Sequence, residues 1–244
     1  FKEKVTVDSD RILGETGDYV LEPQASFVLM DPHTGEVLAL TGGRGEKKQS
    51  KTLNRASNVL RQPGSTFKII TSFAPAIDLY GATLASTYYD SEYTLGNKTF
   101  KNWYSGGYLG FQSIRDGIVY SLNIVAVRCL METVKPERGY QYAQSLGITS
   151  LVKDDENPAL ALGGLTRGVS NLELTQAFSA IANGGELEKA KFFSKIVDQD
   201  GKVLIDTTED KPTQVMKAST AYLLTDAMKE SMESNRAFAS DVRV

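Results

Sequence analysis

The sequence predicts an α/β fold of the α+β type, built mainly from antiparallel strands flanked by helices. Short apolar runs lie on either side of turn-forming clusters, which is typical of β-hairpins. Longer segments repeat apolar residues every three or four positions, which is typical of amphipathic helices. The chain has 244 residues, 41% of them hydrophobic, so it can bury the core of one large domain or of two small ones.

The predicted strands follow from turn chemistry. Residues 1–24 are polar, with Gly and Pro among them, and are expected to form an incoming linker with one strand. The apolar residues 25–30 and 36–40 flank the turn-forming residues 31–35, so a hairpin is expected there. A second hairpin is expected in residues 192–205, around an Asp-Gln-Asp-Gly turn.

The remaining elements follow from apolar spacing and from caps. Residues 80–110, rich in Tyr, Gly, Ser and Thr, are expected to form loops and short strands that line a cleft. The acidic run 154–158 is expected to be a solvated loop. The expected helices are one that begins near Ser65, two that meet at Ser121-Leu122-Asn123 within residues 114–131, and three at 138–146, 172–182 and 218–233.

Charge and composition exclude several classes of function. The 27 Lys and Arg residues are scattered and are balanced by 30 Asp and Glu, so nucleic acid is not an expected partner. With one histidine and one cysteine, a multi-histidine metal site, a zinc site and a disulfide are all excluded, and no cofactor is expected. We expect Cys129 to be a buried structural thiol. His33 is expected to be a solvated turn residue and a poor general base.

A hydrolase or acyl transferase without a suitable histidine needs another base, and Ser65-Thr66-Phe67-Lys68 supplies one. Residues three apart on a helix share a face, so the Lys68 amine can reach the Ser65 hydroxyl. A free lysine, with a pKa of about 10.4, is mostly protonated at neutral pH. The site must therefore lower the pKa of Lys68 by burial or by a nearby cation.

The Ser-x-x-Lys pattern is not specific by itself, because Ser150-Leu151-Val152-Lys153 is a second match. Context favours Ser65, which follows Pro-Gly and opens the helical segment, although an ordinary helix-capping serine explains the pattern too. Ser121-x-Asn123 occurs once in the chain and is either a helix cap or part of the same site. Together the two motifs contain a nucleophile, a base, a hydroxyl proton shuttle and an amide clamp, which is a complete set for acyl transfer.

These motifs give the chain its resemblance to a known family. The segment from Arg61 to Lys68, together with Ser121-Leu122-Asn123, resembles the transpeptidase domain of a penicillin-binding protein, which has the penicilloyl-serine transferase or β-lactamase-like fold. The hairpin of residues 28–43 is similar to the family's first sheet strands. Residues 160–164 and 177–185 resemble its later signature segments. Arg-Gln before Pro-Gly-Ser resembles the bifunctional class A members, which carry an upstream glycosyltransferase region.

The resemblance implies a role for each motif residue. Ser65 is the expected nucleophile toward the penultimate D-alanine of a peptidoglycan stem peptide, and β-lactams are expected to acylate it. Lys68 is expected to take its proton, Ser121 to relay a proton to the leaving amine, and Asn123 to bind the substrate amide. The expected partners are stem peptides and β-lactam antibiotics, at the extracytoplasmic face of a bacterial cell membrane. Any attachment to that membrane is expected through an anchor absent from this chain.

One departure from the family pattern concerns the third motif, Lys-Thr-Gly or Lys-Ser-Gly, which does not occur here. The nearest sequence is His33-Thr34-Gly35, in the first hairpin. We therefore expect residues 1–24 to be the link from a glycosyltransferase region and residues 25–244 to be a transpeptidase domain that stops before the third motif and its strands. Alone, such a piece is not expected to be an active enzyme.

Two alternative functions share the same fold. One is a non-catalytic β-lactam sensor or binding module. The other is a serine β-lactamase, which in class A needs a Glu-x-x-Leu-Asn segment to activate the deacylating water, and the sequence contains no such segment.

Overall fold

A buried helical run, residues 64–80, forms the centre of the computed structural model, which describes residues 11–13, 19–21, 23–45, 49–208 and 210–233. The run begins as the 3₁₀ turn η1 (Gly64–Thr66), continues as the π-helix η2 (Ile69–Phe73) and ends as α1 (Ala74–Tyr80). Every residue from Phe67 to Asp78 is buried, including the polar Lys68, Thr71, Ser72 and Asp78.

The sequence predicted an ordinary amphipathic helix from Ser65, and the structure differs in two respects. Neighbouring helices cover all sides of the run, so it has no solvent-facing stripe between Phe67 and Asp78. Its middle is wound as a π-helix, in which the Ala74 N–H donates to the carbonyl of Ile69. Pro75 follows directly and lacks the N–H that an α-helix would direct to Thr71, which favours a wider turn at this point.

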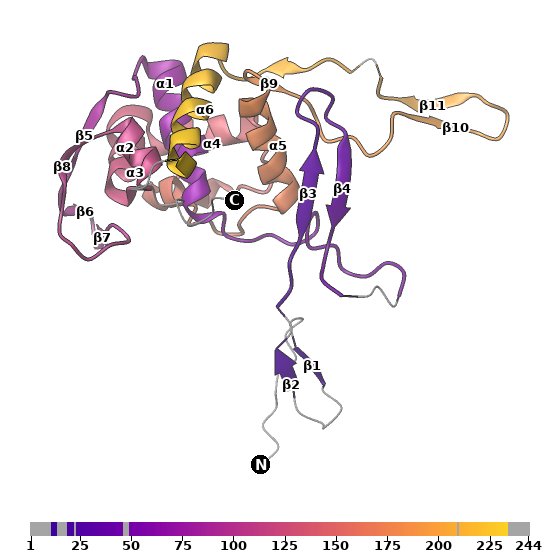
Figure 1. Ribbon diagram of the computed structural model, residues 1–244, viewed down its shortest axis with the longest axis horizontal. Helices are drawn as coiled ribbons and strands as arrows, with labels where there is room; N and C mark the ends of the chain where they lie inside the picture. The colour runs from indigo at the N-terminus through magenta and orange to yellow at the C-terminus, as the bar shows by residue number, and fades with distance from the viewer. Residues whose placement is uncertain (1–10, 14–18, 22, 46–48, 209, 234–244) are drawn as a thin grey trace.

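The other helical elements surround this run (Figure 1). Helices α2 and α3 meet at Ser121-Leu122, which confirms the predicted junction. Gly139 of α4 lies against η2, where a Cβ would come within 2.6 Å of the Thr71 carbonyl oxygen, so the small residue allows the close approach. The elements are α2 (Ile114–Val119), α3 (Asn123–Arg128), η3 (Cys129–Val134), α4 (Pro136–Ser145), η4 (Lys153–Asp155), η5 (Pro158–Leu162), α5 (Asn171–Ala182) and α6 (Ala218–Glu233).

The described strands form antiparallel pairs at the periphery of the helices (Figure 1). Both predicted hairpins are confirmed, as is the mixture of loops and short strands within residues 80–110. The pairs are β1 (Arg11–Leu13) with β2 (Tyr19–Leu21), β3 (Phe27–Met30) with β4 (Val37–Thr41), β5 (Thr87–Asp90) with β8 (Gly110–Ser113), β6 (Tyr93–Leu95) with β7 (Lys98–Phe100), β9 (Glu186–Leu187) with β12 (Thr213–Gln214), and β10 (Lys195–Val197) with β11 (Val203–Asp206).

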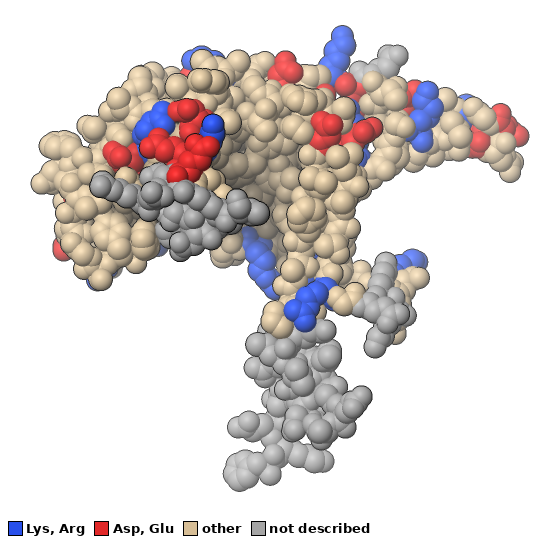
Figure 2. Space-filling view, viewed as in Figure 1, with Lys and Arg blue, Asp and Glu red and all other residues tan. Residues whose placement is uncertain are grey.

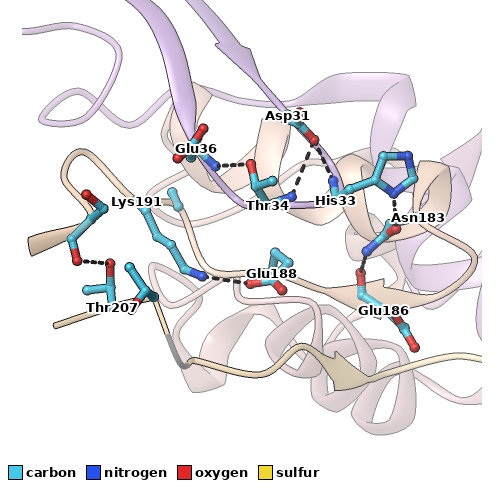
Figure 3. Close-up of polar contacts among 12 residues, drawn as sticks. Asp31, His33, Thr34, Glu36, Asn183, Glu186, Glu188, Lys191 and Thr207 are labelled. Carbon is cyan, nitrogen blue, oxygen red and sulfur yellow. Dashed lines mark hydrogen bonds and ion pairs between the residues drawn. The ribbon is translucent and has the colours of Figure 1, made fainter.

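The turn between β3 and β4 is held by the segment that follows α5 (Figure 3). His33 Nδ1 lies 2.6 Å from Asn183 Oδ1, and the Asn183 amide donates to the Glu186 carbonyl. Backbone bonds join Lys191 to Gly35 and Val37. His33 is therefore in the predicted turn and exposed, but it also connects two parts of the chain that lie 150 residues apart.

Buried polar groups tie the loops to the core. Cys129 is buried, as predicted. The prediction of a solvated acidic loop is wrong for Asp155, which is 1% exposed. Its carboxylate accepts hydrogen bonds from the backbone of Val152 and from both the backbone and the hydroxyl of Thr166, which satisfies it inside the protein.

Helix α6 docks on α1 through the buried carboxylate of Asp78. Asp78 Oδ1 accepts from the Lys217 backbone N–H at 2.9 Å and from the Thr220 hydroxyl at 3.0 Å. Outside this contact, Arg115 of α2 bridges Asp226 and Glu230 of α6, where Figure 2 shows acidic and basic side chains gathered on the surface. No helix in the described part of the chain is both long and apolar enough to cross a membrane.

We expect Asp78→Ala to loosen α6. The substitution leaves the buried Thr220 hydroxyl without its acceptor, at a cost of about 1–3 kcal/mol, and also removes the acceptor of the partly buried Lys217 N–H. Amide hydrogen exchange in α6 measures the change. The matched control is Asp226→Ala, which removes an exposed ion pair worth about 0–1 kcal/mol, and equal exchange in the two variants contradicts the prediction.

Candidate active site

Ser65 lies in the 3₁₀ turn that opens the central helical run, and its side chain is exposed. Gly64 before it has a φ of +59°, a backbone conformation that favours glycine. The Thr66 hydroxyl donates to the Pro63 carbonyl at 2.8 Å and tightens the turn from the other side. Ser65 is thus presented to solvent from a turn whose backbone is fixed on both sides.

A loop distant in the sequence, residues 163–169, clamps this turn. The side-chain amide of Gln62 both donates to and accepts from the backbone of Leu165, at 2.6 Å in each direction. Arg61 and Val169 exchange two backbone hydrogen bonds at 2.9 Å. Gly163 approaches so closely that a Cβ on it would lie 2.4 Å from the Gly64 carbonyl oxygen. The loop therefore supports the Ser65 turn mainly through backbone contacts.

Lys68 follows Ser65 by one helical turn, and its side chain is only 2% exposed. Its Nζ donates to the Ser121 carbonyl oxygen at 2.7 Å and to the Ser121 hydroxyl at 3.0 Å. Burial disfavours the charged form of the amine and lowers the pKa of Lys68 to about 7. This lysine can therefore exist as a neutral base near neutral pH, as the sequence required.

Ser121 occupies the junction between α2 and α3 in a left-handed conformation, with a φ of +52°. Such a conformation costs a non-glycine residue about 1–3 kcal/mol and persists only where the surroundings impose it. The next residue, Leu122, is fully buried, and its N–H donates to the Gly117 carbonyl. Anchored in this way, the turn directs both oxygens of Ser121 at Lys68.

Asn123 begins α3 and is half-buried. Its side-chain Nδ2 donates to the Lys101 carbonyl oxygen at 2.9 Å. Among the described residues none donates to its Oδ1. The amide nitrogen is therefore used within the protein, and the amide oxygen is left to accept a hydrogen bond from a ligand.

The structure separates this group of residues from the other candidates. Ser150 and Lys153, the second copy of the Ser-x-x-Lys pattern, do not meet: the Ser150 hydroxyl donates to the Gly168 carbonyl, whereas Lys153 is exposed and pairs with Glu156. His33 contacts Asn183, remote from Lys68. No cluster of three or more residues able to hold a metal ion occurs in the described part of the chain.

Gln62 and Gly163 hold the Ser65 turn in place, a role that was not predicted from the sequence. Both belong to segments that resemble family signatures, yet their function depends on pairing across about a hundred residues. A glutamine next to a Pro-Gly turn carries no periodic signal that would indicate this partner.

An exposed serine, a buried lysine of lowered pKa and a hydroxyl in contact with that lysine suit nucleophilic acyl transfer. Comparison with known proteins agrees with this chemistry. The family model of the penicillin binding protein transpeptidase domain matches residues 25–243. The chain belongs to this family. The resemblance to class A penicillin-binding transpeptidase domains is therefore confirmed, as is the mixed fold of antiparallel strands and helices.

Several curated penicillin-binding proteins are similar to the chain. It is 33% identical over 223 residues to penicillin-binding protein 1A of Clostridium botulinum, covering 86% of this chain and 26% of that protein. It is 36% identical over 214 residues to penicillin-binding protein 1F of Bacillus subtilis, covering 88% and 29%. The chain thus spans between a quarter and a third of these relatives' length.

Solved penicillin-binding structures share the fold. Penicillin-binding protein 1A from Haemophilus influenzae superposes with a TM-score of 0.75 at 23% identity, over 95% of this chain and 40% of that one. PonA1 from Mycobacterium tuberculosis, in complex with penicillin V, gives a TM-score of 0.71 at 24% identity, over 84% and 56%. At these identities the likeness shows the fold.

We expect the side chain of Lys68 to titrate with a midpoint near 7, because burial disfavours its ammonium form. ¹³C NMR of the lysine side chains measures it. Exposed Lys153 is the internal control, since its ion pair with Glu156 raises its pKa above the ordinary value. A Lys68 midpoint close to that of a free lysine contradicts the prediction.

Proposed function

We propose that this penicillin-binding domain is a serine-type D-Ala-D-Ala transpeptidase that cross-links peptidoglycan stem peptides through an acyl-enzyme. The observation that carries the proposal is the contact of the buried Lys68 amine with Ser121. Lys68 itself lies one helical turn after the exposed Ser65. The family model and the named relatives support the same reaction class. In this role the chain needs no metal or cofactor.

The acylation step uses the three polar groups in sequence. Ser65 Oγ attacks the carbonyl carbon of the penultimate D-alanine, and neutral Lys68 accepts the hydroxyl proton. The C–N bond to the terminal D-alanine then breaks. Lys68 and Ser121 pass a proton to the leaving amine, through the 3.0 Å contact between Nζ and Oγ. The products are free D-alanine and an ester on Ser65.

The second step reverses the direction of proton transfer. The amine of a neighbouring stem peptide attacks the ester carbonyl, gives up a proton through Ser121 and Lys68, and forms the cross-linking amide as Ser65 Oγ regains its proton. Throughout, the Oδ1 of Asn123 accepts from the substrate's backbone N–H. The Ser65 backbone N–H is a donor for the oxyanion, a contribution worth about 3–4 kcal/mol of barrier in known cases.

The proposal includes the setting of the domain. Its partners are stem peptides and β-lactams, which acylate Ser65 in place of the substrate, and its location is the extracytoplasmic face of a bacterial membrane. Residues 1–24 are proposed as the link to an upstream glycosyltransferase region, residues 25–244 as the transpeptidase domain, and the third motif as part of the sequence beyond it. The greater length of the relatives supports this organisation.

A fluorescent penicillin should label the complete natural polypeptide covalently at Ser65. Ser65→Ala should abolish the label, because Ser65 is the exposed hydroxyl one helical turn from Lys68, whereas Thr71 and Ser72 on the other side of Lys68 are buried. Gel fluorescence and peptide mapping measure both results. Ser150→Ala, in the second copy of the motif, is the matched control and should label normally. Labelling that survives in Ser65→Ala rejects the proposal.

The rate of acylation should rise with pH through about 7, because only the neutral form of Lys68 accepts a proton and its pKa is lowered to about 7. Lys68→Arg should reduce the rate by at least about 100-fold, since a guanidinium stays protonated and general base catalysis contributes about 10²–10⁴-fold. Stopped-flow β-lactam acylation measures both effects.

Lys153→Arg provides the comparison and should keep the wild-type pH profile, because Lys153 is exposed and remote from Ser121. An acylation rate that does not change between pH 6 and 8 in the wild-type protein contradicts the assignment of Lys68 as the base.

A further inference from the structure

Three consecutive residues, Lys101 to Trp103, hold the turn that carries Ser121 and Asn123. The Lys101 carbonyl accepts from Asn123 Nδ2 at 2.9 Å. Asn102 Oδ1 accepts from the backbone N–H groups of Asn123 at 2.9 Å and of Ile124 at 3.2 Å. Trp103 Nε1 donates to the Tyr120 carbonyl at 3.0 Å. Both ends of the Ser121-Leu122 turn are therefore fixed from outside.

The contact by Asn102 supplies what α3 lacks. The first N–H groups of a helix have no partner within the helix and are usually capped by a preceding polar side chain. In α3 the capping position is Leu122, whose side chain makes no such bond. Asn102 provides the missing acceptor from another segment, so the position of α3 depends on where Asn102 lies.

Asn102 is itself anchored on the opposite side. Its Nδ2 donates to Asp90 Oδ1 at 2.8 Å and to the Tyr104 hydroxyl at 2.9 Å. A carboxylate can only accept, whereas backbone N–H groups can only donate, so one orientation of the Asn102 amide satisfies both sides. The side chain is thus a bridge of fixed direction between Asp90 and α3.

Asp90, to which this bridge is anchored, is itself held in place by its surroundings. It is 1% exposed, at the end of β5. Its Oδ2 accepts from the Tyr104 hydroxyl at 3.0 Å and from the Leu109 N–H at 2.9 Å. Burial, followed by this bond to Asp90, raises the pKa of Tyr104 to about 12, so the hydroxyl remains a donor. A buried carboxylate is retained only when donors surround it, which here fixes its place.

We propose that Asn102 is a positioning residue for the transfer reaction: through its bonds to the start of α3, it sets Ser121 against Lys68 and aims Asn123 at the substrate. The inference rests on the proposed function. Lys68 makes both of its hydrogen bonds to Ser121. Ser121 lies two residues before Asn123, whose backbone N–H donates to Asn102. Loosening α3 therefore displaces the proton relay without touching Ser65.

The first test compares two variants of the complete natural polypeptide. Asn102→Ala removes both bonds to α3, and we expect β-lactam acylation at Ser65 to slow about 10- to 100-fold, as for a displacement of up to 1 Å in a catalytic group. Tyr104→Phe removes two bonds of the same network, those of the Tyr104 hydroxyl with Asn102 and with Asp90, but leaves both Asn102–α3 bonds. It should keep the acylation rate within about threefold. Equal slowing in the two variants overturns the proposal.

A second readout does not depend on activity. Amide hydrogen exchange at Asn123 and Ile124 should accelerate in Asn102→Ala and stay near the wild-type rate in Tyr104→Phe. If the wild-type protein fails to label at Ser65, the proposed function fails and this readout still tests the positioning. If the wild type labels and Asn102→Ala labels equally fast, only the positioning role is rejected.

A rescue pair covers the case in which Asn102→Ala does not fold. Asn102→Asp keeps the acceptor for α3 but sets a carboxylate against Asp90, and acylation should slow. Adding Asp90→Asn restores a donor–acceptor pair between the two positions, and acylation should recover to within about threefold of wild type. A single Asn102→Asp variant that reacts like the wild type, or a double variant that folds without recovering, overturns the proposal.

Discussion

The desolvation of Lys68 is the constraint on which the rest of the site depends. An ammonium removed from water is costly unless its donors are matched, and the only acceptors that the described structure provides are the two oxygens of Ser121. Burial disfavours the ammonium form and so lowers the pKa of the amine. The neutral amine avoids the desolvation cost. The packing that covers Lys68 therefore also creates its chemistry.

This constraint explains why neighbouring elements cover the central helical run on every side. A helix with one solvent-facing stripe could carry Ser65 and Lys68 at the same spacing, but water would reach the amine. The residues on either side of Lys68, Phe67 and Ile69, belong to the buried core, and η3, α3 and α4 pack around the run they belong to. The left-handed Ser121 belongs to the same arrangement, because its strained backbone directs a carbonyl inward.

The sequence was sufficient for features that depend on local chemistry. Turn residues located the β3–β4 and β10–β11 hairpins, and the cap-forming residues at Ser121 located the break between α2 and α3. Ser65 and Lys68 could be selected because the site chemistry demands a base other than histidine. Features formed by distant pairs were not predictable in this way: the burial of Asp155 depends on Thr166, the Gln62 clamp on Leu165, and the π-helix on a proline within a crowded core.

The two sides of the site are held by different kinds of contact. The Ser65 turn and the 163–169 loop are joined by paired hydrogen bonds, and Gly163 approaches Gly64 too closely for a side chain to fit, so we expect the two segments to move together. The Ser121–Asn123 side is held by side-chain hydrogen bonds from Asn102 and Trp103. A single substitution can remove these bonds without disturbing the Ser65 turn, so the nucleophile keeps its place when the other side of the site changes.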